Sequence, residues 1–244
     1  IEVDDLVHLT VLRTFIDGRL AAEKGETAIA RVAVPSPNCF KAGTTGPDAF
    51  RLPDRGRPVR LIQAEDGQLV TGSLEAHCRI VDGCLVSDPA RDILKIAVLD
   101  RYAGKPPALG FVRGFGLKRG AIASSVAHDS HNVIAVGVED EDLARAINLV
   151  VSRKGGLAAA GPDVEEILPL PVAGIMSQTD GFRTAARYED VDRSAKALGS
   201  HLAAPFMTLS FMALPVIPEL KLTDRGLFAL SSFKHVDLYV APRE

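Results

Sequence analysis

The stretch GFGLKRGAIASSVAHDSHNVIAVG, from Gly114 to Gly137, decides how the rest of this chain is interpreted. It predicts an apolar strand over Ala121–Ala127 and a second strand over Val133–Val136. Between them lie His128-Asp129-Ser130-His131-Asn132, which we call the HDSHN loop. Polar side chains at the edge of a core are costly unless they find partners. The loop is therefore the first candidate for a functional site.

Three kinds of role suit the HDSHN loop. Two imidazoles and a carboxylate are groups that transfer protons near neutral pH. His128 and His131, with Asp129 as a third ligand, would also suit a metal ion, although H-D-x-H spacing alone is weak evidence. In the structural interpretation, the loop closes a tight strand connection, and Asp129 and Asn132 bond the local backbone. Spacing alone favours this structural interpretation slightly.

A serine nucleophile in the same stretch is a weaker hypothesis. Ser124, Ser125 or Ser130 would need His128 or His131 as its base. The sequence contains nothing that resembles G-x-S-x-G. Adjacent residues on a strand also point to opposite faces, which separates the two neighbouring serines.

Four glycines, Gly110, Gly114, Gly116 and Gly120, precede the first of these strands. A dinucleotide-binding loop needs a helix N-terminus to hold the pyrophosphate, whereas a strand follows here. The glycines are therefore expected to relieve backbone strain where the chain passes close to another element.

Before this stretch the pattern divides the chain into three parts. Phe15-Ile16-Asp17-Gly18-Arg19-Leu20 carries a strong hairpin signal, an Asp-Gly turn between apolar residues. Residues 1–33 therefore predict two or three strands, too few for a stable sheet of their own. Residues 34–56 are rich in proline and glycine and are expected to form a linker. The main domain is expected over residues 57–244.

The main domain is expected to contain short strands joined by tight turns. Asp66-Gly67 and Asp82-Gly83 are the turn signals between the early strands. The strands are predicted at Pro58–Ala64, Gln68–Ser73, Ala76–Val81, Cys84–Val86, Leu157–Ala160, Glu166–Leu170, Leu227–Leu230 and Val236–Val240.

Three helices are predicted in the same domain. Asp88 suits an N-cap and Pro89 a first helical position, and the apolar residues that follow, up to Gly104, predict the first helix. Glu141–Lys154 and Gly181–Leu198 carry clearer apolar stripes. The alternation of strands and helices predicts an α+β or α/β fold, with helices on one side of a mixed sheet.

Composition limits the partners of the chain. The formal net charge of the 244 residues is −3, and the isoelectric point is near 6.1. Nucleic acids and anionic membranes both require a basic face, so neither is expected as a partner. No apolar run approaches a membrane span and no export signal opens the chain, which favours a cytoplasmic location.

The three cysteines, Cys39, Cys78 and Cys84, match no zinc-site spacing. Cys78 and Cys84 flank a predicted turn, so a disulfide between them stays open. Free thiols in a reducing compartment are the favoured interpretation.

Three separated blocks resemble one known family. GFGLKRGAIASSVAHDSHN, LPLPVAGIMS (Leu168–Ser177) and PFMTLSFMALPVIPELKLTDRGL (Pro205–Leu227) are similar, in this order, to the C-terminal domain of bacterial adenine deaminases. These enzymes are metal-dependent members of the amidohydrolase superfamily. Weaker agreement around VDGCLVSDPARDILKIAVLDRY extends the likeness over residues 57–227. FIDGRLAAEKG resembles the end of the small β domain that flanks the barrel in that superfamily.

The resemblance implies that the catalytic barrel lies outside this chain. Amidohydrolases hold their metals on a (β/α)8 barrel, with an HxH pair after its first strand. None of the six histidines here forms HxH, and the length leaves no room for a barrel. We therefore expect a C-terminal piece of a longer enzyme, with a divalent metal (Mn, Fe or Zn) on the missing barrel and no metal bound by this chain.

The activity implied by the resemblance is hydrolysis of adenine to hypoxanthine and ammonia, a step of purine salvage. His128, Asp129 and His131 are then candidate accessory catalytic residues, and Ser125, Ser130 and Asn132 are candidate substrate-binding residues. Together they would form a wall over the barrel mouth, because purine nitrogens need both donors and acceptors.

The alternative hypothesis is a structural module that serves oligomerisation or barrel packing. The long apolar segment PFMTLSFMALPVIPEL, residues 205–220, supports it, because such a surface needs a partner. The expected partners are therefore adenine, the N-terminal amidohydrolase barrel and other copies of the chain in a homo-oligomer.

Overall fold

A computed structural model describes residues 1–30, 32–33 and 35–241 of the chain. The chain divides into two units, Ile1–Pro35 and Ser36–Glu244. The predicted small β domain, linker and main domain include Arg31, Val34 and residues 242–244, which lie outside the described residues.

The first unit is a small antiparallel sheet in the order β1-β2-β3-β4. Asp17 and Gly18 both adopt positive φ, at 49° and 74°, which confirms the predicted hairpin turn. The large side chains of β2 are exposed, including Phe15 and Ile16. The four strands are β1 (Glu2–Val3), β2 (Val11–Ile16), β3 (Arg19–Glu23) and β4 (Glu26–Thr27).

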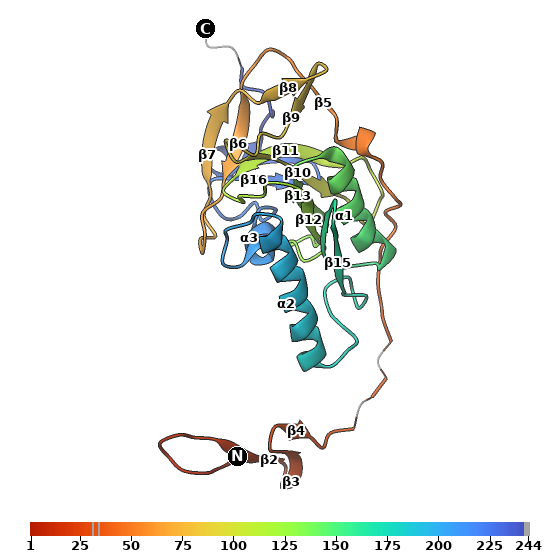
Figure 1. Ribbon diagram of the computed structural model, residues 1–244, viewed down its shortest axis with the longest axis vertical. Coiled ribbons are helices and arrows are strands. Elements are labelled where there is room, and N and C mark those ends of the chain that lie inside the picture. Colours follow the sequence, from red (N-terminus) through yellow and green to blue (C-terminus); the bar gives the residue numbers. More distant parts are fainter. Residues whose placement is uncertain (31, 34, 242–244) are drawn as a thin grey trace. The chain divides into compact units, whose positions relative to one another are not determined.

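The second unit is built on an eight-stranded sheet in the order β15-β14-β12-β13-β10-β11-β6-β7 (Figure 1). Every neighbouring pair is antiparallel except β6 and β11, which run parallel, so the predicted mixed sheet is confirmed. Its strands are β6 (Val59–Gln63), β7 (Gly72–Ala76), β10 (Ile93–Leu99), β11 (Ala108–Arg113), β12 (Ala121–Ser124), β13 (Val133–Gly137), β14 (Gly156–Gly161) and β15 (Val164–Pro169).

The helix predicted after Asp88 is wrong, because Ile93–Leu99 forms strand β10 in the middle of the sheet. All seven of its residues are buried, since the sheet is covered on both faces. A strand buried on both faces reads as a continuous apolar run and resembles a buried helix. Asp88 begins a tight turn instead, exchanging two backbone hydrogen bonds with Ile93.

Two three-stranded sheets flank the main one, in the orders β5-β9-β8 and β16-β17-β18. Three predicted strands are misplaced: β7 and β8 begin later than predicted, and β18 ends before Val236. The elements are η1 (Pro47–Phe50), β5 (Leu52–Pro53), β8 (Arg79–Val81), β9 (Cys84–Val86), β16 (Leu220–Thr223), β17 (Gly226–Ala229), η2 (Leu230–Ser232) and β18 (Lys234–His235).

The helices are α1 (Asp140–Ser152), α2 (Gly181–Ala197) and α3 (Pro205–Phe211). The carboxylate of Asp180 caps α2 by accepting a hydrogen bond from the Arg183 amide at 2.9 Å. Glu139 is the N-cap residue of α1. No described helix is long and apolar enough to cross a membrane.

The helices cover both faces of the main sheet, which corrects the prediction that they lie on one side. Ile96 and Val98 of β10 pack in one core with α2 and α3. Ala97 and Leu99 of the same strand pack in another core with α1 and Phe50. Alternate residues of a strand face opposite sides, so the two cores lie on opposite faces of the sheet.

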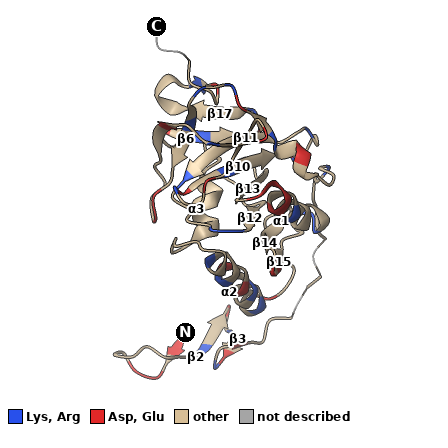
Figure 2. Ribbon diagram, turned by 45° about the horizontal axis from the view of Figure 1, so that its top comes forward, with Lys and Arg blue, Asp and Glu red and all other residues tan. Residues whose placement is uncertain are grey.

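Figure 2 shows residues of both charge signs along α2.

Lys221 on β16 is completely buried, with 0% of its surface exposed. Its ammonium group donates to the Leu69 carbonyl at 2.8 Å. Burial lowers the pKa of Lys221 to about 8, because the charged form loses its hydration.

Replacing Lys221 with methionine is expected to raise the free energy of unfolding by about 2 kcal/mol at pH 7. The ordinary lysine pKa is 10.5 and the folded value is about 8, so the burial penalty is complete below pH 8 and fades as pH rises through 10.5. The advantage of the variant should shrink over this range in urea unfolding experiments. Lys234→Met, at an exposed position of β18, is the control. An advantage that does not change with pH would contradict the explanation.

Candidate functional site

The HDSHN loop joins β12 to β13 in the main sheet, as the two predicted strands require. The His131 amide donates to the Ala127 carbonyl at 2.6 Å, which closes the turn. The His128 amide donates to the Ser210 carbonyl at 3.0 Å, which fixes the loop to α3. The loop conformation therefore depends on a helix about 80 residues away in the sequence.

The structure places the two imidazole rings of the loop next to each other. The ring centroids of His128 and His131 are 5.6 Å apart in an edge-on arrangement, and His128 lies 4.7 Å from the ring of Phe211. Both histidines are half-buried. The Nδ1 atom of His131 is buried and has no hydrogen-bond partner among the described residues.

Burial lowers the pKa of the His131 imidazole below its ordinary value. The charges of His128 and Arg101 act in the same direction, and the Asp129 carboxylate opposes them. His131 is therefore neutral at pH 7, with one ring nitrogen as donor and the other as acceptor.

The remaining predicted site residues divide into an outer and an inner group. Asp129 and Ser130 are exposed at the tip of the loop. Asn132 is buried, and its Oδ1 accepts a hydrogen bond from the Arg101 amide at 3.2 Å. The Ser125 hydroxyl, also buried, donates to the Gly174 carbonyl at 2.5 Å and accepts from the Gly156 amide at 2.8 Å. Ser125 and Asn132 thus connect the base of the loop to neighbouring turns and to β14.

Apolar side chains lie beside the loop. Met207, 55% exposed, is one helical turn from Phe211 on α3, so both residues lie on the same side of that helix. Tyr102, 38% exposed, donates through its hydroxyl to the Ser130 carbonyl at 2.8 Å. The loop therefore has the partly exposed rings of Phe211 and Tyr102 as neighbours.

The described residues do not fit a metal centre. No group of three or more His, Cys, Asp or Glu side chains in this part of the chain is arranged to hold an ion. The cysteines are free thiols, with Cys39 exposed, Cys78 buried and Cys84 partly exposed. Burial raises the pKa of the Cys78 thiol to about 12, which keeps it protonated.

The glycine-rich approach to β12 is held by a carboxylate that sequence analysis missed. Asp92 accepts hydrogen bonds from the amides of Gly114 and Gly116, each at 2.8 Å. These amides are the groups that a phosphate would need. Because a carboxylate of the chain already occupies them, the loop serves structure and not phosphate binding.

A family model described as the adenine deaminase C-terminal domain matches residues 68–234, which is more than half of the chain. The chain belongs to the adenine deaminase family. The match includes all six predicted site residues, from Ser125 to Asn132.

Curated adenine deaminases are similar over nearly the whole chain. The protein of Salinibacter ruber is 51% identical over 242 residues, which cover 98% of this chain and 44% of the relative. The protein of Methanosarcina barkeri is 47% identical over 245 residues, which cover 97% of this chain and 44% of the relative. The protein of a Sulfurovum species is 48% identical over 238 residues, which cover 97% of this chain and 43% of the relative. The chain therefore spans less than half the length of these adenine deaminases.

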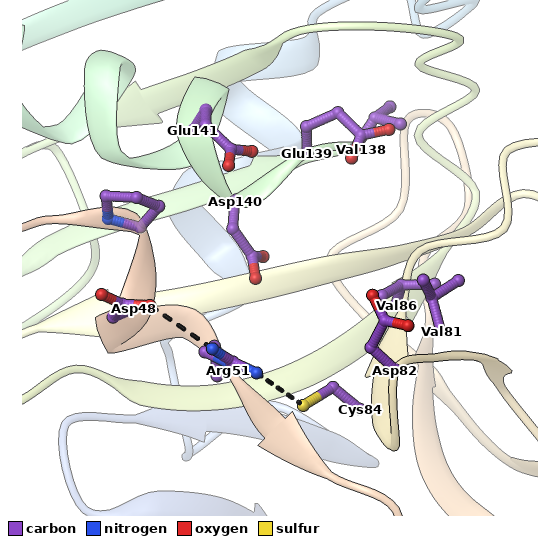
Figure 3. A pocket seen from close by; sticks show the side chains of 11 residues that line it. Asp48, Arg51, Val81, Asp82, Cys84, Val86, Val138, Glu139, Asp140 and Glu141 are labelled. Atoms are coloured by element: carbon purple, nitrogen blue, oxygen red, sulfur yellow. Dashed lines mark hydrogen bonds and ion pairs between the residues drawn. The ribbon is translucent and has the colours of Figure 1, made fainter.

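A hollow in this adenine deaminase domain lies beside the N-terminus of α1, away from the HDSHN loop (Figure 3). Its volume is about 320 Å³, and Asp140 and Glu141 of α1 face Arg51 across it. Arg51 donates to the Cys84 sulfur at 3.8 Å and pairs with Asp48 at 3.7 Å. Carboxylates predominate among its polar side chains, and none of the predicted site residues lines it. The HDSHN loop remains the stronger candidate site.

Proposed function

We propose that this chain is the C-terminal part of an adenine deaminase that hydrolyses adenine to hypoxanthine and ammonia. The proposal further assigns the HDSHN loop to a wall over the active site, which an N-terminal amidohydrolase barrel would build. Two findings support the first part: the family match, and relatives that are more than twice as long as this chain.

One observation carries the assignment of the loop: its ionisable side chains lack partners within the described chain. The half-buried His128 ring forms no hydrogen bond there, and the exposed Asp129 carboxylate forms no ion pair. Half-buried polar groups normally have partners. A partner supplied from outside this chain, such as a purine edge, would satisfy the His128 ring, whereas Nδ1 of His131 is covered by the chain itself.

The roles of the residues follow from their chemistry. A neutral His131 can pair with a purine through Nε2 alone, because its Nδ1 atom is buried in the chain. His128 and Asp129 would orient the base, and Phe211 and Met207 would keep water from its edge. A divalent metal, Mn, Fe or Zn, would supply the hydrolytic nucleophile. Because the described residues do not fit an ion, the proposal places it on the N-terminal portion.

Replacing His128 or His131 with alanine in the full-length enzyme is expected to lower kcat/KM for ammonia release from adenine by about tenfold each, the value of one lost hydrogen bond. The melting temperature should stay within about 2 °C, because neither side chain donates to the backbone. His77→Ala, at an exposed position far from the loop, is the matched control. Unchanged kcat/KM in both variants would overturn the proposal.

The same experiment tests the structural alternative. If the loop is only a conformational clasp, stability and activity should fall together in both variants. The apolar segment that suggested an oligomerisation surface packs largely into the core of its own unit, through residues such as Phe206, Leu209 and Met212. Its large exposed side chains are Met207 and Val216. A stable oligomer would therefore need other surfaces as well.

A further inference from the structure

Arg101, in the turn after β10, is a buried cation without a carboxylate partner in the described part of the chain. Only 5% of its surface is exposed. Its Nη1 atom donates to the Ala173 carbonyl and its Nη2 atom to the Tyr102 hydroxyl, each at 2.8 Å. Its Nε atom is buried without a partner. Burying an unpaired charge costs several kcal/mol, so this arrangement does not serve stability.

The bonds of Arg101 hold both sides of His131. The Arg101 amide donates to Oδ1 of Asn132, and the Tyr102 hydroxyl, which receives the guanidinium bond, donates to the Ser130 carbonyl. His131 itself adopts a left-handed backbone conformation, with φ of 52°. A non-glycine residue adopts this conformation at a cost, so its neighbours must hold it there.

The turn that receives the guanidinium is shaped for it. Gly174 has φ of 77°, and a Cβ atom there would lie 1.8 Å from Nη1 of Arg101, so a side chain at this position would displace the guanidinium. The Gly174 carbonyl accepts a hydrogen bond from the Ser125 hydroxyl, which links the same turn to the end of β12. The guanidinium lies 5.7 Å from the ring centroid of Phe40 and 4.7 Å from that of Tyr102. Ring faces provide part of the stabilisation that a carboxylate would give.

We propose that Arg101 is a positioning residue for the proposed deaminase site: through Tyr102 and Asn132, it sets where the His131 ring stands for the substrate. This inference rests on the proposed function. Arg101 does not touch the substrate in this arrangement. Its guanidinium acts through the Tyr102 hydroxyl and through its charge, whereas the bond to Asn132 comes from its backbone amide and is kept when the side chain is replaced.

The charge of Arg101 adds an electrostatic effect to the geometric one. The titratable groups that face His131 are His128 and Asp129 of the loop and Arg101 and Tyr102 of the adjoining turn, whereas α3 carries no ionisable side chain. Removing the guanidinium should therefore raise the pKa of His131. If catalysis needs neutral His131, the acid limb of the kcat/KM profile then moves to higher pH.

The sharpest experiment compares two hydroxyl deletions in the full-length enzyme. Tyr102→Phe removes the hydroxyl that donates to the Ser130 carbonyl, and Tyr239→Phe removes one that donates to the Pro53 carbonyl, far from the loop. Tyr102→Phe is expected to lower kcat for adenine about tenfold, and Tyr239→Phe to leave it unchanged. Both should lose similar stability, which a urea midpoint measures.

Two replacements of Arg101 separate geometry from charge. Arg101→Lys keeps the charge but cannot bond Ala173 and Tyr102 as a fork, so it should lower kcat without moving the acid limb. Arg101→Met should lower kcat and move the limb upward. If Tyr102→Phe matches Tyr239→Phe in kcat while His131→Ala lowers kcat/KM about tenfold, the role of Arg101 is refuted and the proposed role of the HDSHN loop stands. If His128→Ala and His131→Ala are also fully active, the proposed role of the loop fails.

Discussion

Replacing Lys95 with methionine should lower the free energy of unfolding by about 3–5 kcal/mol, among the largest effects of any single substitution in this chain. Lys95 is 1% exposed in the middle of β10. Its ammonium donates to the Phe50 carbonyl at 2.8 Å and to the Asp140 carboxylate at 2.5 Å. The substitution leaves a partly buried carboxylate without its cation and a buried carbonyl without its donor.

The pH dependence of this loss identifies its cause. Burial raises the pKa of Asp140 above the ordinary value, and the Lys95 ammonium offsets only part of that rise. Without Lys95 the pKa rises further. A raised folded-state pKa gives stability that is present at low pH and lost as pH rises through it. The variant should therefore be least stable, relative to the unsubstituted protein, near neutral pH, and should recover part of the difference towards pH 4.

A double variant and an exposed ion pair provide the controls. Adding Asp140→Asn to Lys95→Met should restore about 1 kcal/mol or more of the free energy of unfolding, because it removes the uncompensated charge. Arg119→Met breaks the pair with Asp163, in which the two side chains are 45% and 60% exposed, and should cost less than about 0.5 kcal/mol. Urea unfolding measures all four proteins. Similar losses in Lys95→Met and Arg119→Met would contradict the importance of burial.

Gly114→Ala should lower the free energy of unfolding by about 3 kcal/mol or more, from two additive causes. Gly114 has φ of 106°, which a residue with a Cβ rarely adopts. The added Cβ would also lie 2.2 Å from the Ala64 carbonyl oxygen, and this oxygen belongs to the backbone and cannot rotate away. The substitution would further disturb the amide that donates to Asp92.

Two other glycines separate the two causes. Gly83 has φ of 72° with nothing within 4 Å of a Cβ, so Gly83→Ala isolates the backbone strain, about 1 kcal/mol. Gly43 has neither a positive φ nor a close neighbour, so Gly43→Ala should be neutral. The stabilities are therefore expected to fall in the order Gly43→Ala, Gly83→Ala, Gly114→Ala in thermal or urea unfolding. A Gly114→Ala protein as stable as Gly83→Ala would refute the close contact.

Local patterns were sufficient to predict α1, α2 and the β14–β15 hairpin, because each carries its own stripe or turn signal. They failed at β10, where the cover on both faces removes the alternation by which a strand is recognised. Lys95 inside that apolar run was a signal of buried pairing, but its partner Asp140 is 45 residues away. Sequence separation of this kind hides tertiary pairs from any window-based argument.

The candidate site was found from the sequence only in part. The HDSHN loop stood out because its five polar residues interrupt an apolar stretch. Arg101 and Tyr102 did not, because an arginine near the end of a predicted helix is ordinarily a solvated surface residue. Nothing local indicates that Arg101 is buried or that Asn132 and Ala173 lie beside it. The division of the loop into exposed and supporting residues likewise needed the fold.

The supports of the HDSHN loop also bear on how the protein folds. They come from the turn near Arg101, from Gly156, from the turn at Gly174 and from Ser210, each about 30 to 80 residues from the loop. The β6–β11 and β12–β14 pairs of the main sheet span comparable separations, so the loop supports and the sheet depend on the same long-range closures. A nascent or partly denatured chain would thus align its histidines only once this sheet has formed, and recovery of function after refolding would not precede recovery of secondary structure.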